Sequence, residues 1–392
     1  MPNDHEPITN ELTLASLYLH IPFCEHKCIY CDFYSIESLD SMERFLAALK
    51  QEILMYTEVG EREKFETIFF GGGTPSLLEP PVLESILSLL RRTFNVHSDA
   101  EVTLEANPGT VEMQKLGRYR EIGINRLSFG VQSFFDDDLR FLTRIHSSQE
   151  AKKAVRLARE AGFDNINIDL IFALPNQSML RWEQNLHQAV ELETQHISAY
   201  SLIVEKNTPL YRMVAANQVT PLPIHQEAEL YQYTMEFLQE AGYVHYEVSN
   251  YAKPGFQSRH NSSYWNHSNY LSFGPSAHSF WSNKRWWNIA NLSTYCEKIF
   301  SGELPINGKE ELTREQLFDE AVMLGLRYQG IDIDLLKVSY GVDLAASHKS
   351  IIDALLQENL AMLDDGKLRL TNQGFLLCDE ITRRLLSNVI LS

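Results

Sequence analysis

The chain has 392 residues, 44% of them hydrophobic, which is enough for one large domain and a smaller one, each with its own core. Its formal net charge of −18 argues against nucleic acid as the main partner, because neutralising a phosphate backbone requires a basic face. The sequence contains no run of 18 apolar residues and no apolar signal segment near Met1, so we expect neither a membrane span nor a secretory leader.

The first half of the chain alternates short apolar runs with amphipathic segments, which predicts parallel strands joined by right-handed helical crossovers. Six strands are predicted, at residues 16–20, 67–70, 102–105, 126–129, 165–170 and 196–201. Helices are predicted between them at residues 42–56, 81–94, 111–121, 149–161 and 181–192. Because a closed barrel of this type needs eight units, six units predict an α/β fold built on a partial, open (β/α)6 TIM-like barrel.

The second half of the chain is expected to form two further regions. Residues 206–300 are interpreted as a connector with a helix at 227–241, followed by a stretch rich in aromatic side chains. Four of the five tryptophans lie in that stretch: Trp265, Trp281, Trp286 and Trp287. With residues 1–15 as an N-terminal tail and 16–205 as the barrel, residues 301–392 remain for a C-terminal domain.

This C-terminal domain is predicted to be mainly helical and winged-helix-like. Helices are expected at residues 312–326, 332–340 and 344–358, followed by a hairpin around Asp365 and Gly366. The winged-helix shape often binds DNA, but a fold does not imply its commonest use. Because the region has no basic stripe, we expect it to pack or to bind a partner.

Cys24, Cys28 and Cys31 directly follow the first predicted strand with C-x3-C-x2-C spacing. Three thiolates can hold three corners of a [4Fe–4S] cluster and leave one iron open for chemistry. A structural zinc site is the alternative, but zinc prefers four ligands, and Cys296 and Cys378 lie hundreds of residues away. Five cysteines without a disulfide framework predict a reducing compartment, the cytoplasm.

Other polar signals also follow predicted strands, where active sites lie in parallel α/β barrels. A Gly71-Gly72-Gly73-Thr74-Pro75 run follows the second strand, and three glycines let the backbone approach a small ligand; a plain tight turn is the alternative. Side chains with polar or charged groups near the ends of later strands are Glu105, Gln132, Arg144 and Asp169. A strand-end aspartate alone is as well explained by a helix cap. The prediction of a site therefore rests on these four residues together.

Together these motifs resemble the radical S-adenosylmethionine (SAM) superfamily. The resemblance implies that Cys24, Cys28 and Cys31 bind a [4Fe–4S] cluster whose open iron takes the amino and carboxylate groups of SAM. In that superfamily, electron transfer from the cluster cleaves SAM to a 5′-deoxyadenosyl radical. The SAM contacts that the resemblance implies are Tyr18, Tyr30, Gly72, Gly73, Thr74, Glu105, Gln132, Arg144 and Asp169. One or two SAM molecules are compatible with it.

Within the superfamily, nearly the whole chain resembles the oxygen-independent coproporphyrinogen III dehydrogenases and their relatives, the HemW heme chaperones. Two departures weaken the dehydrogenase interpretation. Phe33 stands where a dehydrogenase typically has a further cysteine, and only 23 residues precede Cys24, where a dehydrogenase has a longer arm.

The run from Arg259 to Trp265 matches the HNxxYW motif associated with heme binding in the chaperones. The resemblance implies heme contacts from His260, Asn261, Tyr264 and Trp265. An imidazole can ligate heme iron, and aromatic rings can cover the macrocycle. His267 and His278 are alternative ligands, and a hydrogen-bonded interior histidine is the structural alternative for His260.

The sequence therefore predicts a radical SAM heme chaperone of porphyrin metabolism that passes heme to acceptor hemoproteins, such as membrane respiratory ones. An electron donor is implied, and contact with acceptors would bring the cytoplasmic protein transiently to the membrane surface. Decarboxylating coproporphyrinogen III dehydrogenase is the alternative, so enzymatic activity stays open. A nucleic-acid-binding regulator with the cluster as redox sensor is a third hypothesis, which the acidic charge disfavours.

Overall fold

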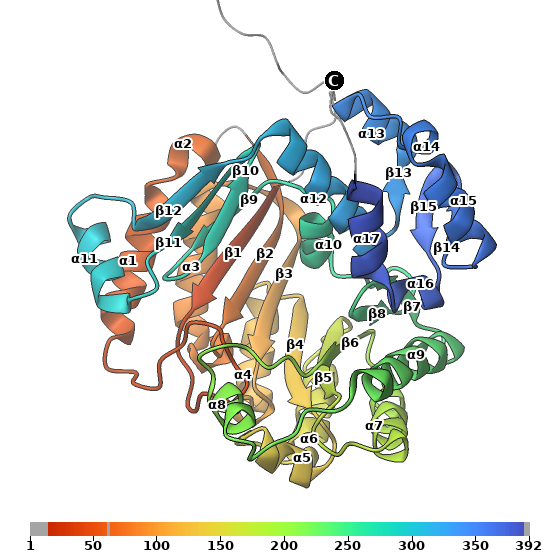
Figure 1. Cartoon of the computed structure of the whole chain (residues 1–392). Helices are drawn as coiled ribbons and strands as arrows, with labels where there is room; N and C mark the ends of the chain where they lie inside the picture. The colour runs from red at the N-terminus through yellow and green to blue at the C-terminus, as the bar shows by residue number, and fades with distance from the viewer. Residues whose placement is uncertain (1–14, 61–62, 388–392) are drawn as a thin grey trace, which may run out of the picture.

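The computed structural model describes residues 15–60 and 63–387 (Figure 1). The predicted tail, residues 1–15, lies outside the described residues except for Ala15, which begins the first strand. None of the helices in the described residues is both long and apolar enough to cross a membrane.

Six parallel strands follow one another across the centre of the main sheet, as the alternating pattern predicts. They are β1 (Ala15–Ile21), β2 (Lys64–Gly72), β3 (Asn95–Ala106), β4 (Arg126–Gln132), β5 (Ile166–Phe172) and β6 (His196–Ser201). Each pairs in parallel with the next, so the predicted partial (β/α)6 barrel is confirmed. Their carboxyl ends therefore meet at one edge, where the predicted site residues should gather.

Helices cover the outer side of these strands (Figure 1). They are α1 (Met42–Leu54), α2 (Thr57–Gly60), α3 (Pro80–Thr93), α4 (Met113–Glu121), α5 (Asp136–Phe141), α6 (Ser148–Glu160) and α7 (Met179–Glu191). Helix α6 illustrates why they form: Ser147 and Glu150 make a reciprocal capping box, and the buried face recurs at Ala151, Ala154 and Ala158. This spacing of three and four residues places one apolar stripe against the sheet.

The region interpreted as a connector extends the sheet at both edges, which the sequence reading did not predict. Beside β1 lie β9 (Tyr270–Phe273), β10 (His278–Trp281), β11 (Lys284–Asn288) and β12 (Ile306–Glu311); beyond β6 lie β8 (Asn250–Ala252) and β7 (Val244–Glu247). These strands are mostly three to five residues long, too short to show a clear alternation of apolar and polar residues. Strand β12 follows the predicted boundary at residue 301, yet it pairs with β11 in the main sheet.

Four helices accompany these added strands. They are α8 (Pro209–Ala215), α9 (Ile224–Glu240), α10 (Arg259–Trp265) and α11 (Leu292–Phe300). Helix α11 packs along α1, and α10 packs against β1 and β2.

The C-terminal part has its own buried core, with residues from Phe318 to Leu385. Its helices are α12 (Arg314–Arg327), α13 (Ile333–Tyr340), α14 (Leu344–Ser347), α15 (Lys349–Gln357), α16 (Asn372–Phe375) and α17 (Cys378–Leu386). A small antiparallel sheet joins β13 (Ile331–Asp332), β15 (Lys367–Leu370) and β14 (Ala361–Asp364).

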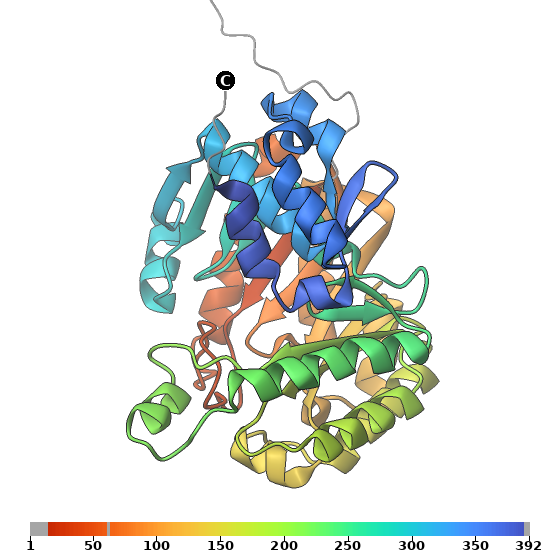
Figure 2. The same cartoon turned by 45° about the vertical axis from the view of Figure 1, so that its right-hand side comes forward.

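The expected hairpin turns at Asp365 (φ 48°) and Gly366 (φ 74°), the two positive φ angles of a type I′ turn. The single helix expected at 344–358 is interrupted at His348, between α14 and α15. Both views show these helices as one block beside α10, β7 and β8 (Figures 1 and 2).

Candidate functional site

The cysteine loop that follows β1 is held against the glycine turn that follows β2. The backbone N–H of Gly73 donates to the Ile21 carbonyl (2.8 Å), and that of Thr74 donates to the Phe23 carbonyl (2.7 Å). The Thr74 hydroxyl lies 3.6 Å from the Cys24 sulfur, to which it donates. Two strand ends that are adjacent in the sheet thus fix the start of the cysteine loop.

Glycine is required in this turn because the chain itself approaches so closely. A Cβ atom on Gly73 would lie 2.5 Å from the Phe23 carbonyl oxygen, and one on Gly72, at φ +108°, would lie 2.6 Å from the His20 ring. Both distances are shorter than side-chain packing permits. The turn therefore needs these glycines for its own packing, and an additional role in ligand approach stays a prediction.

Two half-buried carboxylates, Glu105 at the end of β3 and Asp169 on β5, lie near each other beside this turn. Glu105 accepts from the Gly72 N–H (3.2 Å), and Asp169 accepts from Asn167 (2.8 Å) and Ser128 (3.3 Å). Burial, and then the charge of Asp169, raise the pKa of Glu105 to about 8; burial also raises the pKa of Asp169. A cationic ligand group placed here would lower the pKa values of both carboxylates and so favour their charged forms.

Arg144 connects the cysteine loop to the end of β4. Its guanidinium donates from Nη1 to the Cys28 sulfur (3.3 Å) and from Nη2 to the Gly130 carbonyl (2.7 Å). A Cβ on Gly130 would lie 3.0 Å from the Gln132 amide nitrogen and 3.2 Å from Arg144 Nη2, so these two side chains meet over Gly130. Within the described part of the chain, the buried Nε of Arg144 has no hydrogen-bond partner.

The predicted SAM contacts thus gather at one edge of the sheet. Tyr18 shares the space next to Gly71 with Glu105: a Cβ at Gly71 would lie 3.0 Å from the Tyr18 ring and 3.2 Å from the Glu105 carboxyl carbon. Tyr30 lies beside Arg144, whose charge opposes the rise in the Tyr30 pKa that burial causes.

The residue types present suit a cluster and a zwitterionic cofactor, although no three His, Cys, Asp or Glu side chains in the described residues are grouped closely enough to hold a metal ion. Cys24 and Cys28 are buried and Cys31 is half-buried, and burial raises the pKa of the Cys31 thiol to about 11. A metal cation would be needed to hold such a thiol as thiolate at neutral pH. The carboxylate pair and the unpartnered Arg144 Nε offer acceptors and a donor to groups of opposite charge.

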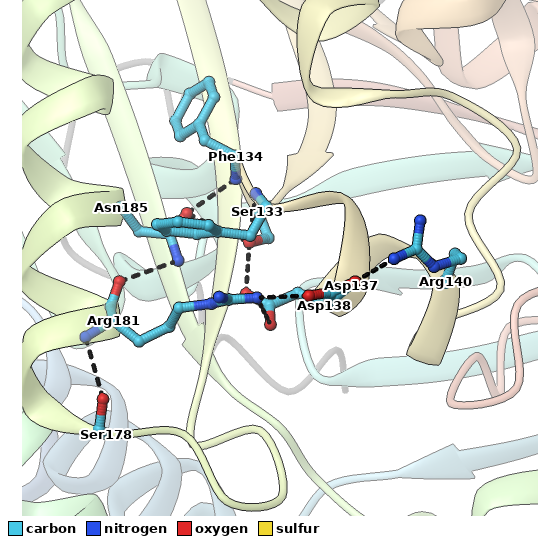
Figure 3. A network of polar contacts seen from close by, with 9 residues as sticks. Ser133, Phe134, Asp137, Asp138, Arg140, Ser178, Arg181 and Asn185 are labelled. Atoms are coloured by element: carbon cyan, nitrogen blue, oxygen red, sulfur yellow. Dashed lines mark hydrogen bonds and ion pairs between the residues drawn. The ribbon is translucent and has the colours of Figure 1, made fainter.

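A polar network that the sequence reading missed supports the end of β4 (Figure 3). The side-chain amide oxygen of Asn185 on α7 accepts from the Phe134 N–H (2.7 Å) and lies 3.2 Å from the Ser133 hydroxyl oxygen. Ser133 donates to Asp138 (2.6 Å), to which Arg181 donates from the same helix as Asn185 (3.2 Å). This network ties α5 and α7 to the residue after Gln132.

One signal in the sequence could have revealed this network. Asn185 is fully buried between Trp182 and Ala189 on the apolar face of α7. A buried amide on an apolar helix face must find partners, because leaving it unsatisfied costs free energy.

The histidine of the HNxxYW motif is an interior residue. His260 on α10 is 1% exposed, and its two ring nitrogens lie 2.7 Å from the Thr67 hydroxyl and 2.9 Å from the Tyr264 hydroxyl. Burial lowers the pKa of His260 to about 3, so the imidazole is neutral. Glu101 accepts from the His260 backbone N–H (3.1 Å) and thereby anchors the helix. The structure thus places the predicted iron ligand in the protein interior.

An aromatic pocket of about 650 Å³ lies next to the cysteine loop. Its rings come from β1, the cysteine loop, α10, β9 and β10: Tyr18, Phe33, Tyr34, Tyr264, Tyr270 and Phe280. Tyr264 is the member of the predicted heme set that lines it; Asn261 and Trp265 are half-buried elsewhere on α10. The alternative ligands His267 and His278 both line it, and His278 is exposed.

The comparison with known proteins agrees with this arrangement. The sequence matches the Radical SAM superfamily over residues 18–189 and the HemN C-terminal domain over residues 312–377. Its fold is similar to the solved structure of coproporphyrinogen III oxidase (HemN) from Escherichia coli, with TM-score 0.82 over 96% of this chain and 91% of that chain, at 24% identity. The barrel, the cysteine loop and these matches define a radical SAM protein, a class that implies a [4Fe–4S] cluster and SAM.

Curated relatives give the family. Proteins named heme chaperone HemW are 37% identical in Bacillus subtilis, over 94% of this chain and 98% of the relative, and 35% identical in Mycobacterium tuberculosis, over 94% of each. The Escherichia coli HemW is 40% identical over 68% of this chain and 70% of its own length. The chain belongs to the HemW family of radical SAM proteins.

Proposed function

We propose that this protein is a heme chaperone, which binds heme in the aromatic pocket beside its cluster site and passes it to acceptor hemoproteins. The observation that carries the proposal is the position of this pocket. Asp32, Phe33 and Tyr34, the residues directly after Cys31, form part of its wall. A volume of about 650 Å³ is in the range of cofactor pockets, and six aromatic rings suit a flat macrocycle.

The cluster is proposed to bind to Cys24, Cys28 and Cys31, and SAM to the strand-end residues around it. When bound, the cluster and SAM supply reductive radical chemistry. The chain's own residues would do the positioning. Arg144 holds the Cys28 side of the loop through its 3.3 Å contact, and Glu105 with Asp169 would orient a cationic group of SAM.

His278 is the histidine that we propose as heme-iron ligand. It is exposed on the pocket wall and stacks against Trp287, with 5.9 Å between ring centroids. His267 is less suited, because its Nε2 already lies 2.9 Å from Glu320 and its ring stacks flat on Phe280 at 4.5 Å. His260 would not contact the heme iron itself. Its Nε2 lies 2.9 Å from the Tyr264 hydroxyl and would hold that side chain in position on the pocket wall.

Heme titration of the anaerobically reconstituted protein tests this assignment. His278→Ala should change the Soret band and weaken heme binding, while iron and sulfide content stay at the wild-type level. His225→Ala is the control, because it removes an exposed imidazole outside the pocket lining, and its Soret band should remain that of the wild type. An altered spectrum in His260→Ala but not in His278→Ala would contradict the assignment.

The dehydrogenase alternative is tested on the same reconstituted sample. The protein is incubated with SAM, a reductant and coproporphyrinogen III, and protoporphyrinogen is measured. We expect no turnover. Sustained formation of protoporphyrinogen would replace the chaperone proposal by the enzymatic one. The acceptor hemoproteins, the electron donor and a cytoplasmic location with transient membrane contact remain parts of the proposal.

A further inference from the structure

A carboxylate from the C-terminal part already occupies a basic site on the rim of the aromatic pocket. Glu320 of α12 accepts from Arg285 of β11 through both oxygens, at 3.0 and 2.8 Å. Nε2 of His267 lies 2.9 Å from one oxygen of the same carboxylate, but it makes no well-formed hydrogen bond within the described residues, and burial lowers the pKa of His267. All three side chains line the pocket.

This arrangement has the chemistry of a carboxylate-binding site. Both contacts come from one nitrogen, Nη2 of Arg285, which lies between the two oxygens of Glu320, and such charge-assisted hydrogen bonds are stronger than neutral ones. The ring of Phe280 lies beside both side chains, stacked against the His267 ring at 4.5 Å between centroids and 5.8 Å from the Arg285 guanidinium carbon. A flat aromatic ligand on these rings would therefore have its carboxylates close to Arg285.

The Glu320 contact is one that a ligand could displace. The Arg285 and Glu320 side chains are 27% and 20% exposed, so water reaches the pair, and partly exposed ion pairs contribute little to stability. Arg285 would keep a partner after exchange, because its Nη1 also donates to Glu310 (3.0 Å). Met323 and Leu324 of α12 line the pocket as well. Displacing Glu320 would therefore remove one contact that holds α12 against this side of the pocket.

We propose that Arg285 and His267 form a binding site for a carboxylate of a planar aromatic ligand, such as a heme propionate, and that Glu320 occupies it until the ligand replaces it. This inference rests on the proposed heme binding and adds how the ligand is recognised. Exchange of one carboxylate for another would couple ligand binding to movement of α12. The position of α12 in the C-terminal part would therefore depend on whether a ligand fills the pocket.

The test compares two probes on the full-length protein: iron protoporphyrin IX and its dimethyl ester, in which both carboxylates are blocked. Wild-type protein should bind the free acid about tenfold more tightly than the ester, because only the free acid can pair with Arg285. Arg285→Gln should remove this difference by weakening the acid alone. Glu320→Gln should bind the acid several-fold more tightly, because the competing carboxylate is gone.

Glu310→Gln is the matched control, because it removes another carboxylate from Arg285 at a position outside the pocket lining. Its affinity for both probes should equal that of the wild type. Hydrogen exchange provides a readout independent of affinity. Amides of α12 should exchange faster in wild-type protein once the acid is bound, and in Glu320→Gln without any ligand.

The outcomes separate this inference from the proposed function. Wild-type protein that binds neither porphyrin would overturn both. Wild-type protein that binds the acid and the ester equally, with variants that do not differ from it, would overturn the inference and leave heme binding in place. Equal weakening of both probes by Arg285→Gln would also overturn it, because that pattern means a change in pocket shape.

Discussion

The two sites of this molecule are built in different ways. The cluster and SAM site collects residues at or beyond the carboxyl ends of successive parallel strands, so that Cys24, Glu105 and Arg144 come together because the repeat aligns these ends. The aromatic pocket is assembled from β1, α10, β9 to β11 and α12, and its lining runs from Tyr18 to Leu324. A regular repeat positions the first site, whereas long-range packing positions the second.

Removing a cluster ligand is the strongest way to test whether the two sites are independent. Cys24→Ala, Cys28→Ala or Cys31→Ala should abolish the brown cluster absorbance, since each leaves two thiolates for the cluster. Iron and sulfide analysis measures the loss, and Cys296→Ala is the control because Cys296 is buried between α11 and α1. Retention of the full cluster in any of the three variants would refute the ligand assignment. Heme affinity that falls together with the cluster would show that the sites are coupled.

The half-buried carboxylate pair predicts a pH effect confined to the strand-end site. Burial raises the pKa of Glu105 from 4.5 to about 8, so folding favours its protonated form, and this contribution is lost as pH rises from about 4.5 through 8. In cofactor-free protein, Glu105→Gln should therefore gain about 2–4 kcal/mol over the wild type between pH 5 and pH 9. Urea unfolding at several pH values measures the difference. Parallel curves for variant and wild type would show that Glu105 ionises normally.

The glycine turn should tolerate no side chain. Gly73→Ala places a Cβ 2.5 Å from the Phe23 carbonyl and 2.9 Å from that of Ile21, and such overpacking costs about 1–3 kcal/mol of unfolding free energy. Gly117→Ala is the matched control: nothing lies within 4 Å of its added Cβ, and alanine in α4 should stabilise by roughly 0.5–1 kcal/mol. Thermal unfolding and cluster content measure both. A Gly73→Ala variant as stable as the wild type would mean that the cysteine loop can shift away from the turn at no cost in free energy.

The Asn185 network should give an effect no larger than that of the glycine turn, and it tests which contacts keep the strand-end site rigid. Asn185→Leu leaves the buried Phe134 N–H without its acceptor, which costs about 1–3 kcal/mol. SAM affinity should fall by about threefold to tenfold, because the residues before Ser133 lose their tie to α7. Gln184→Ala, at an exposed neighbouring position, is the control. Lost stability with unchanged SAM affinity would confine the network to a structural role.

What could be predicted from the sequence also differs between the regular repeat and the regions assembled by long-range packing. All six central strands were predictable, and so were five of the seven helices between them, because each shows an apolar run or an amphipathic pattern of its own. Helices α2 and α5 were not predicted, since four and six residues are too few to show a helical period. The strands β9 to β12 were not, since short pieces such as Tyr270–Phe273 become strands only when an existing edge, here β1, offers them hydrogen bonds. The HNxxYW motif can be recognised in the sequence, but which of its side chains faces a pocket depends on how α10 packs against β1 and β2.

The sequence by itself determined the three-cysteine loop, the glycine turn and the carboxylates at the strand ends, because these positions follow from a local repeat. Only the tertiary structure decided that His260 is an interior hydrogen-bonding residue and that His278 and Arg285 face the aromatic pocket. The physical reason is distance along the chain: period and spacing act over a few residues, whereas the pocket depends on contacts between segments hundreds of residues apart.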